Sequence, residues 1–139
     1  MTDLFTEFPW LAVLLGALGY FFLGAIWYSK IMFANQWIIL TKVDVNDPNG
    51  KKGMAVTMIL SFVVMFITSV GLGILAKKLE LKGWMSGLKM GALVGVCFGV
   101  AAICISYLYE KRPWALHFIN GAYTVLGNII AAIIICVMI

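Results

Sequence analysis

The apolar stretch Trp114–Ile139 carries hydrogen-bonding side chains on one helical face. His117, Asn120, Thr124 and Asn128 are spaced three, four and four residues apart, which places all of them on one side of a helix. Amide and imidazole groups that stay unpaired in hydrocarbon are costly, so this face must turn away from lipid. Two interpretations stay open for it: hydrogen bonds between helices, or the lining of a substrate path.

A second group of polar and aromatic residues belongs at one end of the expected helix bundle. Alternating chain direction brings the end of the first apolar stretch, the end of the third and the start of the fourth to one membrane face. The residues placed there are Trp27, Tyr28, Ser29, Glu110, Arg112, His117 and Asn120. They predict a shallow site for a lipid headgroup or a small amphipathic ligand, with arginine and amide as donors and aromatic walls. The alternative is an interfacial belt with an ion pair that fastens the helix ends.

Catalytic and metal chemistry have little support in these residues. The single histidine has no Asp, Cys or Glu at the spacing of a catalytic triad or a metal cluster. We therefore expect no enzyme activity, no catalytic or metal-binding residue and no cofactor.

The polar loop after residue 42 does not match a calcium-binding loop, because Pro48 falls on a ligand position and Ala55 on the glutamate position. Cys97, Cys104 and Cys136 lie at different depths, so no disulfide is expected.

The elements that must position these groups are membrane spans. The 139 residues are 63% hydrophobic and 12% charged, with a mean hydropathy of +1.04, more apolar surface than a soluble domain of this size can bury. Four apolar runs are long enough to span, at about 9–28, 54–76, 84–109 and 114–139, and the segment Ile31–Leu40 suits the interface. We predict a single membrane domain over residues 1–139: an all-α integral membrane protein with four transmembrane helices in an up-down bundle and a short interfacial helix after the first.

The third span has glycine at every fourth position from residue 83. Such a row forms a smooth groove, a glycine zipper, along which two helix backbones can approach closely in a bilayer. Matching depths along antiparallel spans three and four puts a threonine and an asparagine beside the groove. The residues assigned to helix packing are Gly87, Gly91, Gly95, Gly99, Thr124 and Asn128. A ligand or ion path along the groove is the alternative.

The net charge of +4 comes from basic residues in loops and near helix ends. This distribution is typical of membrane topology and headgroup contact, so no nucleic acid partner is expected. Asp3 and Glu7 near the start argue against a secretory signal peptide. Six basic residues fall on one face (Lys30, Lys42, Lys51, Lys52, Lys111, Arg112) and four on the other (Lys77, Lys78, Lys82, Lys89). The positive-inside rule then places the first loop in the cytoplasm and both termini outside.

Several short motifs follow one another along the chain in a familiar order. They are W-Y-S at Trp27–Ser29, Phe33 with Trp37, E-K-R-P at Glu110–Pro113, and I-N-G-A-Y at Ile119–Tyr123. In these motifs and in its span pattern the chain resembles the small bacterial membrane proteins of domain-of-unknown-function family seventeen sixty-one. Lys30 stands where family members often have proline. The resemblance implies a four-span protein of the bacterial cytoplasmic (inner) membrane and supplies no activity to carry over.

Two functions remain open from the sequence. The first is a binding or passive-transport unit for a lipid or small amphipathic ligand, working as a homo-oligomer. The second is a structural or regulatory subunit whose glycine-lined helix packs against a partner membrane helix. No Asp, Glu or Arg lies in the middle of any span, which argues against an ion-coupled carrier because such carriers normally keep one there. The expected partners are the lipid bilayer and either a second copy or a foreign helix.

Overall fold

Five helices make up the computed structural model, which describes residues 5–42 and 53–139. Four of them are long and apolar enough to cross a membrane, and a short helix follows the first, so the predicted fold class is confirmed. Their bounds are α1 (Trp10–Trp27), α2 (Ala34–Thr41), α3 (Met54–Lys78), one continuous rod Trp84–Glu110, and α6 (Trp114–Met138). The rod consists of α4 (Trp84–Val94), the π-helical segment η2 (Gly95–Val100) and α5 (Ala101–Glu110). Asp3 and the loop 43–52, with most of the rejected calcium loop, lie outside the described residues.

Local backbone chemistry sets where these helices begin and end. α1 follows Pro9 and α6 follows Pro113, and proline lacks an N–H that the start of a helix would leave unpaired. α4 follows Gly83, whose φ of 86° suits glycine because it has no Cβ. α2 and α5 end at Lys42 and Lys111, both in the left-handed conformation with φ of 58° and 56°. The turn at Lys111 returns the chain along α5, which makes α6 antiparallel to the rod.

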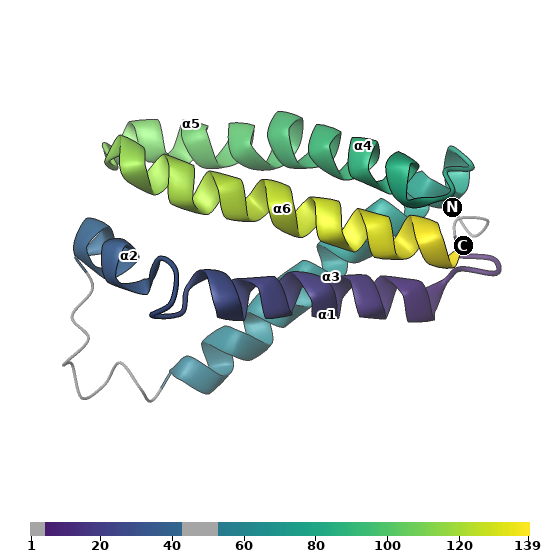
Figure 1. The fold of residues 1–139 in the computed structure, drawn as a ribbon, viewed down its shortest axis with the longest axis horizontal. Helices are drawn as coiled ribbons and strands as arrows, with labels where there is room; N and C mark the ends of the chain where they lie inside the picture. The colour runs from purple at the N-terminus through teal and green to yellow at the C-terminus, as the bar shows by residue number, and fades with distance from the viewer. Residues whose placement is uncertain (1–4, 43–52) are drawn as a thin grey trace.

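Helix α6 is the centre of the bundle (Figure 1). The rod α4–α5 lies along one side of α6, α1 lies along the other, and α3 crosses the bundle at an angle. The start of α1 and the C-terminus lie at one end of the bundle, and α2 lies at the opposite end. The apolar core gathers near the termini, where side chains from α1, α3 and α6 such as Val13, Leu72, Ala76 and Ile135 are almost fully buried. The end that carries α2 is therefore held together by other contacts.

The glycine row of the rod lies directly against α6. A Cβ placed on Gly87 would come within 2.6 Å of Ile133 Cα, and one on Gly91 within 2.5 Å of Ile129 Cα. At Gly95 the nearest atom is Val125 Cα, at 2.8 Å. Backbone meets backbone at all three positions. Because α6 of the same chain fills the groove here, a partner helix has no access to it.

The rod departs from a regular α-helix at η2. A π-helical turn, closed by an i→i+5 hydrogen bond, contains more residues than the 3.6 of an α-helical turn. Glycines spaced four residues apart therefore turn away from the α6 backbone after Gly95. Gly99 accordingly faces the Thr124 methyl group, and its nearest α6 neighbours are side-chain atoms. Asn128 lies beside Gly95, with its Cβ 3.5 Å from the position of an added Cβ. The π-helical segment thus ends the backbone contact and opens the space that the polar side chains of α6 occupy.

Candidate binding site at the α2 end

One asparagine joins three helices at the end of the bundle that carries α2. Tyr28, which ends α1, donates its hydroxyl hydrogen to Asn120 Oδ1 over 2.5 Å. Asn120 Nδ2 in turn donates to the Tyr107 hydroxyl of α5 over 2.6 Å. The amide thus has a protein partner on both of its polar atoms, which stabilises a half-buried polar group. Asn120 therefore joins the ends of α1 and α5 to α6.

His117 lies one turn before Asn120 on α6 and is also buried, with 7% of its surface exposed. Its Nδ1 is 3.1 Å from the Pro113 carbonyl, and because a carbonyl can only accept, Nδ1 carries the proton. The ring packs between Tyr107 and Trp114, with ring centroids 5.2 and 4.8 Å away. Its Nε2 has no hydrogen-bond partner among the described residues. The histidine ring therefore contributes chiefly to packing beside the Asn120 hydrogen bonds.

Aromatic side chains of α1 and α6 extend this buried layer toward the middle of the bundle. Tyr123 packs edge-on against Tyr20 and Tyr28, with centroid distances of 5.3 and 5.1 Å. The Trp27 indole donates to the Ile119 carbonyl over 3.0 Å, which ties the end of α1 to α6. These contacts form a rigid aromatic layer that joins the end of α1 to α6.

Outside this layer, two hollows adjoin each other beneath α2. The first is an open apolar hollow of about 510 Å³ between α2 and α6, lined by Phe33, Gln36, Ile39, Leu40, Ala115, Phe118 and Ile119. The second, of about 450 Å³, is polar and is lined by Leu40, Thr41, Lys42, Glu110, Lys111, Arg112 and Pro113. Leu40 lines both hollows. Together they form an amphipathic surface groove, which we call the α2 groove.

Three cations and one carboxylate line the polar part of the α2 groove. Arg112 Nε is 3.5 Å from Glu110 Oε2, and the two side chains are 40% and 53% exposed, so this pair contributes little to stability. Lys42 and Lys111 have no carboxylate partner among the described residues. The described lining of the polar hollow therefore carries a net positive charge.

The residues predicted for the site separate into two groups. Tyr28, His117 and Asn120 come together inside the bundle, whereas Glu110 and Arg112 line the α2 groove on the outside. Trp27 donates to an α6 carbonyl as described above. Ser29 donates its hydroxyl to Ile26 O in its own turn, over 2.6 Å. The predicted ligand site thus mixes interior and surface residues, and its role in binding stays a prediction.

Several residues of this region had not been assigned to the site. Tyr107 and Tyr123 complete the interior layer, and Lys42, Leu40 and Phe118 line the α2 groove. Tyr107 and Tyr123 carry a sequence signal, because they lie at the depth of Asn120 or on its face. Leu40 belongs to the apolar segment Ile31–Leu40, which the sequence predicts as a possible cover over this end of the bundle. Lys42 and Phe118 carry no sequence signal, since their meeting depends on how α2 folds back. No group of three potential metal ligands forms within 5–42 or 53–139.

Comparison with known proteins identifies the chain at the level of its family. No curated protein and no solved structure matches it. A family model described as "Protein of unknown function (DUF1761)" matches residues 11–136, which includes all four candidate spans apart from one residue at the start of the first and two at the end of the last. The family resemblance seen in the motifs is therefore confirmed. This chain, a small multi-span membrane protein, belongs to the DUF1761 family.

Proposed function

We propose that this protein binds a lipid or a similar amphipathic ligand in the α2 groove. The observation that carries the proposal is the adjoining pair of hollows, one apolar and one positively charged, which share Leu40. A volume of about 510 Å³ is within the range of small-molecule sites. An amphipathic ligand matches both parts, with its tail against α6 and its polar group at the turn between α5 and α6.

The attachment of α2 supports the same proposal. No residue of α2 is fully buried, so this helix covers the groove without closing it. Aromatic contacts hold it at two points: Phe33, just before the helix, lies against Trp27 at 4.7 Å, and Trp37 in its middle lies against Tyr28 at 6.0 Å. A helix without buried residues can move to admit an apolar chain and can gain contacts when that chain is bound.

The interior residues have a supporting role in this proposal. Asn120 is hydrogen-bonded to both Tyr28 and Tyr107. This network fixes the helix ends against which α2 packs. Substitutions in this network should lower both thermal stability and retention of the ligand. Substitutions of the groove residues should lower ligand retention alone, which separates ligand binding from support of the bundle.

Filling the apolar hollow tests the proposal. Ala115 is exposed and lines the hollow, so Ala115→Trp should occupy it, and Gln36→Trp should do so from the α2 side. The matched control is Ala122→Trp, because Ala122 is exposed on the same helix two turns further along and does not line the hollow. Native mass spectrometry would count lipid adducts after loading with phosphatidylcholine and phosphatidylglycerol of identical acyl chains.

The proposal predicts that both groove variants lose the adducts while the Ala122 variant keeps them. All three proteins should unfold at the same temperature as the parent. Adducts that persist in both groove variants would show that the lipid binds elsewhere. Equal loss of adducts in all three variants would show that lipid binding does not depend on the α2 groove.

A further inference from the structure

We propose that the ligand of the α2 groove is an anionic phospholipid, whose phosphate lies among Lys42, Lys111 and Arg112 while an acyl chain occupies the apolar hollow. This inference rests on the proposed function and adds the chemical class of the headgroup. It draws on the charge of the polar hollow, on the backbone at its two lysines, and on the way the two hollows join.

The charge of the polar hollow favours an anion. Among the described residues, Glu110 is the single carboxylate in its lining, and it approaches Arg112. Lys42 and Lys111 remain without a carboxylate among the described residues. A phosphate with a net negative headgroup can satisfy both ammonium groups and the guanidinium. Within residues 5–42 and 53–139, the cation of a choline headgroup would find one carboxylate there, and Arg112 already pairs with it.

The backbone brings both lysines to the groove in an unusual conformation. Lys42 ends α2 and Lys111 ends α5, and both adopt left-handed φ values, 58° and 56°. The negative end of each helix dipole favours a cation at this position. The left-handed conformation strains a residue that has a Cβ, and glycine fits it more easily. Neither turn needs lysine for its shape, so the charge can be removed without damaging the turn.

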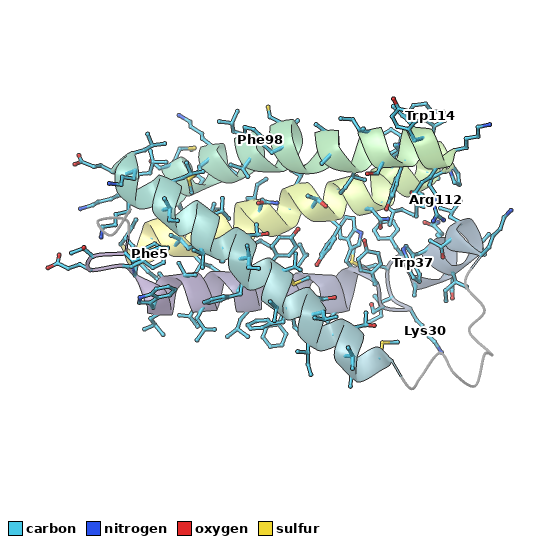
Figure 2. All side chains as sticks on the ribbon, turned by 180° about the vertical axis from the view of Figure 1, so that it is seen from behind. Phe5, Lys30, Trp37, Phe98, Arg112 and Trp114 are labelled. Atoms are coloured by element: carbon cyan, nitrogen blue, oxygen red, sulfur yellow. The ribbon has the colours of Figure 1, made fainter. Side chains whose placement is uncertain are left out.

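The join between the hollows fits the shape of a phospholipid. Leu40 lines both parts, and Pro113 in the polar lining is two residues from Ala115 in the apolar lining. The step from cationic to apolar surface is therefore short, as it is between a phosphate and the start of an acyl chain. Arg112, Trp37 of α2 and Lys30 are all at the same end of the molecule (Figure 2), and Lys30 does not line the polar hollow.

The test compares lipids that differ only in the headgroup. The parent protein is loaded with equal amounts of phosphatidylglycerol and phosphatidylcholine of identical acyl chains, and the adduct ratio is read by native mass spectrometry. Phosphatidylglycerol should predominate. The double variant K42G/K111G should lower the ratio by about 25-fold, or about fivefold for each lysine near the headgroups. Its thermal stability should not fall, because glycine suits both turns.

Two further variants make the result specific. Lys30→Gln removes one charge at the same end of the molecule, outside the lining of the polar hollow, and it should leave the ratio unchanged. Glu110→Gln removes the competing carboxylate and should raise it. The inference would be overturned if K42G/K111G kept the parent's ratio of phosphatidylglycerol to phosphatidylcholine adducts. It would also be overturned if Lys30→Gln lowered that ratio as much as the double variant does. If Ala115→Trp still removes both lipids in that case, the groove binds lipid without selecting charge, and only the headgroup assignment fails.

A soluble competitor separates the lipid from free phosphates. Glycerol phosphate has the anionic group and lacks the acyl chain, so it should leave the phosphatidylglycerol adduct in place. Displacement by glycerol phosphate would assign the polar hollow to a soluble phosphate and would contradict the lipid.

Discussion

Replacing Gly91 with alanine should destabilise the bundle, although alanine is the better helix former. The added Cβ would lie 2.5 Å from Ile129 Cα, 2.7 Å from Asn128 O and 2.8 Å from Ile129 N. All three atoms belong to the α6 backbone, so α6 must withdraw by roughly 1 Å to reach ordinary contact, and a gap of that size forfeits up to about half of each neighbouring dispersion contact. We expect a net loss of about 1–3 kcal/mol in the free energy of unfolding.

The matched control is Gly71→Ala in α3. Gly71 is exposed within the helix, and an added Cβ there meets nothing within 4 Å. Alanine should therefore be neutral or should stabilise by up to about 1 kcal/mol. The two substitutions have the same chemistry, so their difference isolates the close helix contact.

The buried thiol of Cys136 provides the assay. Its side chain is 1% exposed, and in a protein that also carries Cys97→Ala and Cys104→Ala it is the single cysteine. Maleimide labelling in detergent at increasing temperature then reports exposure of the α6 core. Gly91→Ala should be labelled at a lower temperature than Gly71→Ala. Equal labelling curves would refute the reasoning, because they would mean that α6 does not press against Gly91.

Two other predictions concern the hydrogen-bond network and the topology. Tyr28→Phe and Tyr107→Phe should each leave one Asn120 atom unpaired and cost about 1–3 kcal/mol in the same thiol assay. Because both bonds share one amide, the double variant should cost less than the sum of the single variants, and a strictly additive result would argue against a shared network. A C-terminal reporter that is active only in the cytoplasm should be silent, and a strong signal would reverse the predicted orientation.

The helical framework could be predicted from sequence because it follows from local properties. Apolar length alone locates the four long helices within a few residues, and Pro9, Gly83 and Pro113 mark starts that their backbone chemistry favours. The helix after the first span begins at Ala34, three residues beyond the expected Ile31, since the preceding residues form turns. The π-helical segment in the third span could not be predicted, because residues 95–100 continue the apolar and glycine pattern of the helix on either side.

The candidate site was predicted only in part, for a physical reason. Helical spacing and chain direction place Tyr28, His117 and Asn120 at one end of the bundle, and they do meet there. Spacing does not say which side chains face inward, so residues that bond one another were grouped with the surface pair Glu110 and Arg112. Lys42 joins that pair only because α2 folds back over the start of α6, a long-range contact without a local signal.

Mapping where a lipid tail lies would test the central claim most directly. Phosphatidylglycerol with a photoreactive group in its acyl chain is incorporated into vesicles with the protein, and the cross-linked residues are read by mass spectrometry. The exposed apolar surface at the start of α3, near Val56 and Leu60, serves as the reference for ordinary lipid contact. Cross-links should be enriched over this reference at residues 33–40 and 115–119, and Ala115→Trp should abolish the enrichment. Labelling at the α2 groove no higher than at α3 would contradict the account.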